Sequence, residues 1–538
     1  MTVETIHPSI STPHAAQRAI SLVRQRLSAP PAEVVVFFIV ALVGAWFTIP
    51  GSLWNADTHV FLTASIVDRG SLNIDPFAAL TGDIASAHGH FYADKAPGLS
   101  LAAVPFYALI RLIYLHGATY QSLISAPGGI ATMEMVRYWL AVALAAIPTG
   151  IVAALLVWMA RRMGAGPWWS IAIGLIYGLG TTARAFATLF FSHQFAACLI
   201  FSAYVILFRV RRGEINERWT ILGGFLLGYA IVTENPTIIA LAALGIYVVT
   251  ATGRGRRLVA WLALGVAPAA LIYMAYNAAA FGGPLALGYS HLAGPDEFQQ
   301  GQAQGVFGVT YPSLEAIWQT TFGPYRGIFL LSPVLLLAIP ALVLLYRRSG
   351  WRADALVCAA IGIGFFLFNW SYFAWDGGYS MGPRHVLPAV PFLILPLAEL
   401  VRPGRQHGWR LATGALGAYS LIVVEASAAT TSLFDQRLSS PLTQWVLPRL
   451  AGMNVNPKIP NGAAAGLPEA FAHASPLFLT ARLASNWGQW VNLPGLVQLW
   501  PVAIISCALL FWYAYGARPI GARPIGALSR AQAQTGAN

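Results

Sequence analysis

The stretch from Trp54 to Pro97 reads WNADTHVFLTASIVDRGSLNIDPFAALTGDIASAHGHFYADKAP, and it decides how the rest of the chain is arranged. It follows the first long apolar run and precedes the next one. Only 10% of all residues are charged, yet this stretch holds a dense set of carboxylates, histidines and cations. These are Asp57, His59, Asp68, Arg69, Asp75, Asp83, His88, His90, Asp94 and Lys95. We therefore expect a polar loop that an apolar scaffold holds at a membrane surface.

Composition predicts the class of that scaffold. With 538 residues, 57% of them hydrophobic, and a mean hydropathy of +0.62, the chain needs lipid as the solvent for most of its surface. This predicts an all-α polytopic membrane protein. The net charge of +12 comes from short arginine clusters between apolar runs, a pattern typical of cytoplasmic loops rather than of nucleic-acid binding. The three cysteines all lie inside apolar runs without metal or disulfide spacing.

The side of the membrane follows from the arginines. Arg18, Arg24 and Arg26 precede the first apolar run, so a cytoplasmic lead at 1–32 and an outer loop at 51–133 are expected. The segment Gly98 to His116 is ambiguous. If it crossed the membrane, all later arginine clusters would face outward. We therefore predict that it lies along the outer surface as an interfacial amphipathic helix.

This assignment predicts about twelve transmembrane helices. The predicted spans are 33–50, 134–160, 167–183, 187–209, 219–234, 236–250, 257–280, 327–346, 353–371, 385–401, 408–428 and 496–515. The core at 33–428 is followed by an outer-face loop or small cap at 429–495 and the last span at 496–515. The tail at 516–538 repeats GARPI, and we expect it to be disordered and cytoplasmic.

The predicted outer face gathers the unusual polar residues, which suggests one site there. Asp57 can accept a proton from an incoming hydroxyl, and Lys95 or Arg384 can hold a phosphate whose tail stays in lipid. Arg184 and Arg326 are further candidates for the phosphate. Side chains expected to contact the substrate are His59, His193, Glu234, Asp376, Tyr379 and His385.

Each of these residues also has a purely structural reading. Asp57 is placed to cap a helix that starts THVFLTASIV, at Thr58. Lys95 can be an interfacial residue whose stem lies on apolar surface. His193 can be a hydrogen-bonded packing residue, and Gly377 with Gly378 can make a tight turn.

Taken together, the motifs resemble a known family. They are N-x-D-T (55–58), DRGSLNID (68–75), FYADKAPG (91–98), SHQ (192–194) and WDGGYSMGPRH (375–385). Their order is similar to that in membrane glycosyltransferases of the C-type fold, in the branch of protein O-mannosyltransferases and lipid A aminoarabinose transferases. The resemblance covers roughly residues 33 to 400. It implies a polyprenyl-phosphate sugar donor, an inverting transfer, and an active site on the periplasmic or extracellular face.

The resemblance also implies roles for single residues. Asp57 matches the catalytic aspartate of the first loop, Lys95 matches the lysine at the donor phosphate, and Asp94 occupies the place of its acidic neighbour. Two departures leave the acceptor chemistry and any need for metal open. Thr58 stands where an acidic residue usually follows the aspartate, and Ser192 with His193 stands where a second acidic residue is expected.

A divalent metal is possible but not required. Histidines and carboxylates share the first loop, with His90 and Asp94 as possible ligands, but His88-Gly89-His90 lacks the spacing of helical zinc pairs. No other cofactor is expected.

The expected function is a glycosyltransferase in the inner (plasma) membrane of a bacterium, with its active site outside. The acceptor is a glycan, a lipid or a protein. The alternatives are a transporter or flippase for a lipid-linked sugar and a glycan ligase or polymerase. A transporter needs polar groups through the full depth of the bilayer and often shows inverted repeats, whereas here the polar residues collect at one face.

Overall fold

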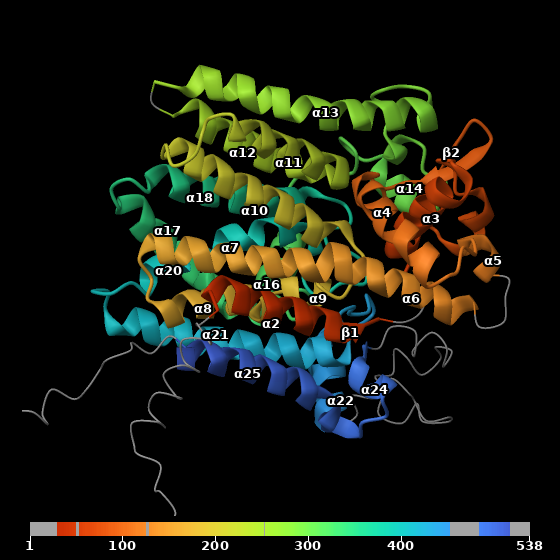
Figure 1. Cartoon of the computed structure of the whole chain (residues 1–538). Helices are drawn as coiled ribbons and strands as arrows, with labels where there is room; N and C mark the ends of the chain where they lie inside the picture. The colour runs from red at the N-terminus through yellow and green to blue at the C-terminus, as the bar shows by residue number, and fades with distance from the viewer. Residues whose placement is uncertain (1–29, 50–52, 125–128, 252, 452–483, 517–538) are drawn as a thin grey trace, which may run out of the picture.

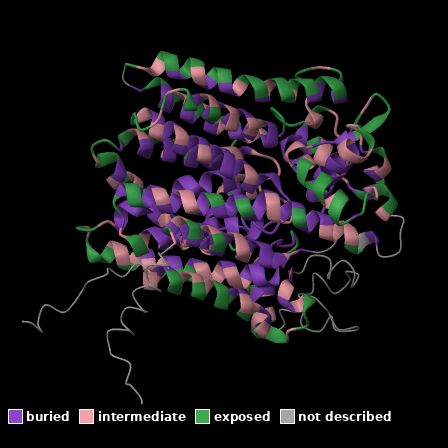
Figure 2. Cartoon of the chain, in the orientation of Figure 1, coloured by how far each residue is buried: buried purple, intermediate pink, exposed green. Residues whose placement is uncertain are grey.

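A computed structural model of the chain describes residues 30–49, 53–124, 129–251, 253–451 and 484–516 (Figure 1). The predictions for most of the N-terminal lead, for the tail after Gly516 and for the middle of the 429–495 segment lie outside these residues. Within them, nearly all regular structure is helical, which confirms an all-α polytopic membrane protein. Figure 2 shows buried residues gathered in the middle of the bundle and exposed ones on the outer helices.

All twelve predicted spans are helical over most of their length. The main helices of the bundle are α2 (Ala32–Trp46), α6 (Gly129–Ala141), α7 (Ile147–Met163), α8 (Pro167–Gly180), α10 (Ser192–Arg211), α11 (Trp219–Thr233), α12 (Ile238–Val249), α13 (Gly255–Phe281), α17 (Ala338–Arg347), α18 (Arg352–Ser371), α19 (Val390–Ile394), α20 (Leu397–Leu400), α21 (His407–Thr430) and α25 (Trp500–Gly516). The π-helical turn η2 (Val142–Ala146) joins α6 to α7.

Six of the described helices are long and apolar enough to cross a membrane, by length and composition. They are Ala131–Met163, Ser192–Arg211, Gly255–Phe281, Arg352–Ser371, His407–Thr430 and Gly495–Gly516. Other predicted spans are shorter. At about 1.5 Å per residue, the 15 residues of α2 are shorter than a hydrocarbon core of about 30 Å. The 385–401 span is broken into η6 (Arg384–Ala389), α19 and α20, because Pro388, Pro391 and Pro396 interrupt its backbone hydrogen bonding.

The arginine clusters meet at one end of the bundle, at the left in Figure 1, which we call the arginine-rich end. Ion pairs join helix ends there: Arg161 at the end of α7 lies 3.2 Å from Glu33 at the start of α2, so these two helices are antiparallel. Further pairs at this end are Arg162–Glu214, Arg212–Asp354, Arg257–Glu217 and Arg348–Glu399.

The first loop covers the opposite end, which we call the capped end (Figure 1, right). Its elements are α3 (Trp54–Arg69), η1 (Asp75–Leu80), β2 (Ile84–Ala87), β3 (His90–Ala93), α4 (Gly98–Ile113) and α5 (Tyr120–Ile124). The strands β2 and β3 form an antiparallel hairpin, and α14 (Asp296–Gln302) lies nearby in Figure 1.

Helix α4 lies across the capped end instead of running through the bundle (Figure 1). Asp68 at the end of α3 holds it, through Tyr107 (2.8 Å) and Arg111 (3.2 Å). Leu112 and Ile113 on its last turn are 71% and 64% exposed, which suits a helix at a membrane interface. The arginine clusters within the described residues therefore remain at the other end. Which face of the membrane the capped end occupies stays a prediction.

The segment after the gap at 452–483 is tied to the first bundle helix. Strand β4 (Ser485–Asn486) pairs antiparallel with β1 (Phe47–Thr48), which directly follows α2. Trp46 also donates to the backbone oxygen of Gln498 at 3.2 Å. Residues 484–498 thus pack beside the capped end, before α25 returns along the bundle.

Candidate functional site

Helix ends from distant parts of the chain meet beneath the first loop. We call the set Lys95, His193, Glu234, Arg384 and His385 the capped-end cluster. The rings of His193 and His385 are 5.8 Å apart, and His193 contacts Glu234. Burial raises the pKa of the Tyr372 hydroxyl to about 12. The positive charges of Lys95 and Arg384 act on the same hydroxyl and oppose that rise.

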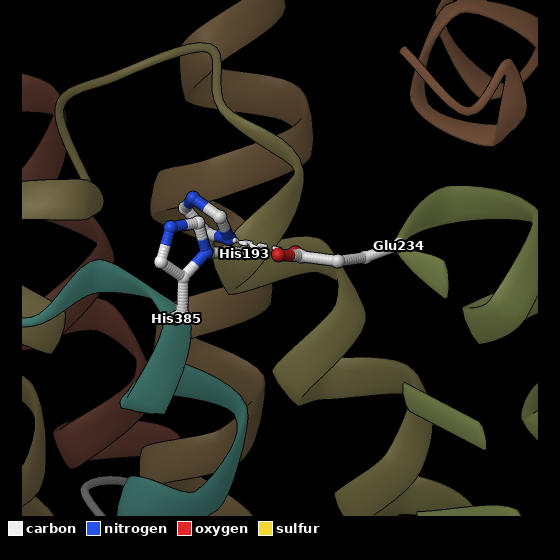
Figure 3. Close-up of side chains that lie close together, drawn as sticks. All are labelled: His193, Glu234 and His385. Carbon is white, nitrogen blue, oxygen red and sulfur yellow. Dashed lines mark hydrogen bonds and ion pairs between the residues drawn. The ribbon is translucent and has the colours of Figure 1, made fainter. Parts of the chain in front are cut away.

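His193, Glu234 and His385 lie side by side in Figure 3. His193 is in the first turn of α10, which begins after the extended residue Phe191. Glu234 ends α11 with an extended backbone, and His385 belongs to η6. The Nδ1 of His193 lies 2.6 Å from a Glu234 oxygen, and the Ser192 hydroxyl donates to the other oxygen at 3.2 Å. The Nε2 atoms of both histidines are buried and have no hydrogen-bond partner among the described residues.

Lys95 is held between two carboxylates. Its Nζ lies 2.6 Å from Asp94 and 3.1 Å from Asp83, and it stands 5.6 Å from the ring centre of Phe298. Burial raises the pKa of Asp94 to about 6, and the positive charge of Lys95 opposes that rise. Burial lowers the pKa of Lys95, but the two carboxylates raise it more, so it stays protonated.

Arg384 differs from Lys95 because no carboxylate of the described residues pairs with it. It is half-buried, its guanidinium stands 5.9 Å from the ring centre of Phe191, and its Nε is buried without a partner. In the described part of the chain it makes no hydrogen bond or ion pair. Gly377, at a φ of +71°, leaves room for it, since a Cβ there would lie 2.9 Å from the Arg384 Cγ. The glycine pair thus makes a turn, as one reading of the sequence expected, and the turn also seats Arg384.

The other two predicted phosphate ligands are fully buried and fixed. The Nε of Arg184 lies 2.9 Å from Glu425, but its Nη1 and Nη2 have no partner among the described residues. Arg326 donates to the backbone oxygens of Gly378 (2.8 Å) and Phe434 (3.0 Å). Arg326 therefore holds the 375–385 loop in place.

Asp57 lies apart from the capped-end cluster. One of its oxygens accepts from Arg137 at 2.6 Å, and the other accepts from the Leu53 backbone amide at 2.7 Å. The structure does not place Asp57 at the cap of a helix that begins at Thr58: α3 begins at Trp54 with Leu53 as its N-cap, and Asp57 lies in the first turn and accepts from the Leu53 amide. No hydrogen bond or ion pair between described residues joins Asp57 to Lys95 or Asp94.

His59 is on the other side of the same helix. Two positions along α3 correspond to about 200° around the helix axis, so Asp57 and His59 have different neighbours. His59 contacts the Ser100 hydroxyl at 3.0 Å. Burial, with the charges of Lys95 and His193, lowers its pKa to about 3. Neutral His59 thus borders the cluster, whereas Asp57 faces Arg137.

The remaining predicted residues border the site or lie outside it. Asp376 accepts from Tyr325 (3.2 Å) and Gln436 (3.0 Å), and Tyr379 is partly buried against the core. His90 pairs with Asp75 at 2.7 Å on the surface, while Asp94 is buried beside Lys95. The structure therefore does not bring His90 and Asp94 together as metal ligands.

A pocket of about 420 Å³ opens beside Tyr372. Aromatic and amide side chains line it, among them Tyr311, Trp370, Trp375, Gln300 and Gln304. Tyr372 belongs to this lining, and its ring is 5.2 Å from that of His385. The pocket thus shares Tyr372 with the surroundings of the cluster.

Sequence reasoning missed two charged partners in this region. Arg137 and Glu425 lie inside apolar runs, at 134–160 and 408–428. A charge within an apolar run is the signal that could have identified both of them. Only the structure shows that they pair with Asp57 and Arg184.

Comparison with known proteins gives a likeness in fold alone. No protein-family model and no curated protein matches the chain. Among solved structures, the archaeal oligosaccharyltransferase AglB from Archaeoglobus fulgidus, in complex with an inhibitory peptide and a dolichol-phosphate, is 14% identical, with a TM-score of 0.44 over 73% of this chain and 55% of that one. This chain thus spans about half the length of AglB.

ArnT from Cupriavidus metallidurans is also similar. Its apo form is 16% identical, with a TM-score of 0.44 over 93% of this chain and 75% of that one. Its form bound to undecaprenyl phosphate is 16% identical, with a TM-score of 0.41 over 90% and 74%. A likeness of this size does not assign an activity.

Proposed function

We propose that this chain transfers a sugar from a polyprenyl-phosphate donor to an acceptor hydroxyl, with inversion at the sugar, at the capped end of the bundle. The observation that carries the proposal is Arg384, a half-buried guanidinium with no partner in the described part of the chain, between Phe191 and His385. A phosphodiester at the membrane surface would supply the missing anion while its tail stays in lipid.

Lys95 and Arg384 would contact the donor phosphate in different roles. Lys95 is already neutralised by Asp83 and Asp94, so Arg384 supplies the main attraction and Lys95 positions the headgroup. Arg184 is a further candidate through its unpartnered Nη atoms. Arg326 acts indirectly, by holding the loop that carries Arg384.

Asp57 is the proposed general base. The acceptor oxygen forms a bond to the anomeric carbon while the bond from that carbon to the phosphate oxygen breaks. The phosphate leaves with the electron pair, and the acceptor proton passes to the Asp57 carboxylate. Since Arg137 and the Leu53 amide occupy both oxygens, the acceptor must displace one contact or share an oxygen with it.

The other predicted residues would bind the sugar or the acceptor. His59, His193, Glu234 and His385 would hydrogen-bond sugar hydroxyls, whereas Asp376 and Tyr379 lie in the 375–385 loop. The pocket beside Tyr372 is the proposed route for the acceptor, whether glycan, lipid or protein. The proposed location is the plasma membrane, with the capped end outside.

The test is transfer by the intact chain in lipid nanodiscs. The protein is incubated with labelled polyprenyl-phosphate sugars and membrane extracts as acceptors, and the products are identified by mass spectrometry. Transfer by the wild type and its loss in Arg384→Met are expected. Movement of the intact lipid-linked sugar across a vesicle membrane without transfer would establish the transporter alternative, and attachment of a whole glycan would establish a ligase.

A further inference from the structure

We propose that His193, Glu234 and His385 bind a divalent metal ion, with a donor set suited to Zn²⁺. One ligand atom from each residue lies within 4.8 Å of the others, and in the described part of the chain this is the one group of histidine, cysteine and carboxylate side chains so placed. Figure 3 shows the Glu234 carboxylate directed toward the two imidazole rings. The first loop, where the sequence suggested a metal, is not involved.

Glu234 carries the strongest argument. Six described carboxylates are buried, and five of them pair with arginine or lysine: Asp57, Asp94, Asp354, Glu399 and Asp435. Glu234 is 8% exposed, and among the described residues its side-chain partners are His193 and the Ser192 hydroxyl alone. Burial of an unpaired carboxylate is costly, so this site lacks a cation. A metal ion is one solution and a proton on His193 is the other.

The two histidines favour the metal. Each has a buried Nε2 without a hydrogen-bond partner among the described residues, although most buried polar atoms are satisfied. A protonated His193 would leave its own Nε2–H and the Nε2 of His385 unsatisfied. A metal ion makes use of the second imidazole, which the proton does not.

The geometry suits an ion with an open position. Ligand atoms on a tetrahedral zinc ion with bonds of about 2.0–2.1 Å lie roughly 3.3 Å apart, so small side-chain rotations would bring this set to bonding distance. Two histidines and one glutamate leave a fourth position, as in catalytic zinc sites. Ser192 holds the Glu234 carboxylate from outside, as outer-shell groups do.

The role of the ion rests on the proposed function, whereas its binding does not. Arg384 directly precedes His385, so the proposed ion would lie near the place proposed for the donor phosphate. The metal would share the negative charge of the leaving phosphate with Arg384.

The binding test uses purified full-length protein in nanodiscs, stripped with a chelator and then titrated with Zn²⁺ and with Co²⁺. We expect one Zn²⁺ per chain by elemental analysis and the visible absorption of a low-coordinate Co²⁺ ion. The variants His193→Ala, Glu234→Gln and His385→Ala should each lose this absorption, and Ser192→Ala should weaken binding about 10- to 100-fold. His291→Ala is the matched control, because it removes an imidazole at the same end that stacks on Phe281.

Two results would overturn the proposal. One is wild-type protein that binds no Zn²⁺ or Co²⁺ under these conditions. The other is binding that the three variants leave unchanged while their thermal unfolding matches that of the wild type. The outcome is independent of the proposed function: metal binding without sugar transfer contradicts only the function, and transfer by stripped protein without metal binding contradicts only the metal site.

Discussion

The two ends of the bundle differ in how completely certain charged side chains are paired. At the arginine-rich end, Glu399 is fully buried and receives Arg348, Arg402 and Arg405, and buried Asp354 pairs with Arg212. At the capped end, Arg384 has no partner among the described residues, and Glu234 has no arginine or lysine. Paired charges fix helix ends and help to orient the chain, whereas incompletely paired ones indicate where a ligand supplies what is missing.

The largest expected effect is on turnover, through Asp57. Asp57→Asn should lower sugar transfer about 10²- to 10⁴-fold, because a positioned base contributes about that much. It also leaves Arg137 buried without its carboxylate, so folding must be measured alongside by thermal unfolding.

Arg137→Gln separates the two roles of Asp57. It breaks the same ion pair but keeps the carboxylate, so a loss of stability with much smaller loss of turnover is expected. Equal losses of turnover in the two variants would mean that Asp57 acts only as the ion-pair partner of Arg137. Its role would then be structural, like that of the paired carboxylates at the arginine-rich end.

Donor binding should change next. Arg384→Met should weaken the affinity for a polyprenyl-phosphate sugar about 10- to 100-fold, since hydrogen bonds to charged groups contribute about 1.5–3 kcal/mol. Arg352→Met is the matched control, because Arg352 also pairs with no carboxylate of the described chain and lies over the Tyr346 ring at the arginine-rich end. Equal binding by both variants in a filter or scintillation assay would remove the distinction between the ends.

A stability effect without a functional effect is expected at the arginine-rich end. Glu399→Gln leaves three arginines without their carboxylate. Because those arginines are about one quarter to one third exposed, the loss should be about 1–3 kcal/mol rather than the full cost of a buried pair. Thermal unfolding should show it, while turnover per folded molecule should match the wild type. A large loss of turnover in the folded fraction would show that this end also takes part in the reaction.

The smallest effect concerns pH. Burial raises the pKa of Asp94 to about 6, above its usual value, so the folded protein binds this proton more tightly than the unfolded chain. The stability from this group is fully present below the unfolded pKa and is lost as pH rises through about 6. The melting temperature of the wild type should therefore fall between pH 5 and pH 7, relative to that of the Asp94→Asn variant. The same pH dependence in both proteins would assign it to other groups.

The sequence predicted the scaffold better than the site. Apolar runs and arginine clusters located all twelve helical segments, because the apolar run of a helix and the arginines that flank it are local features of the sequence. The proline-broken 385–401 segment was the least regular. The sequence also picked out the members of the capped-end cluster, since ionisable groups are rare here.

The sequence could not predict which charged side chains pair, because the pairs depend on how helix ends that are distant in the chain meet. The sequence grouped Asp57 with Lys95, but the structure sets Asp57 toward Arg137 and Lys95 toward Asp83 and Asp94. Likewise, His193 and Glu234 are 41 residues apart, and only the turns before α10 and after α11 bring them together.

The most direct test is to locate the lipid phosphate. A photoreactive polyprenyl-phosphate analogue, with its reactive group beside the phosphate, is bound to the wild type in nanodiscs, irradiated and mapped by mass spectrometry. We expect cross-links to Arg384 and its neighbours in 372–385 and to the region of Lys95, and their loss when unlabelled lipid competes. Competable cross-links instead to the arginine-lined pocket at the other end, formed by Arg211, Arg212, Arg347 and Arg352, would contradict the account.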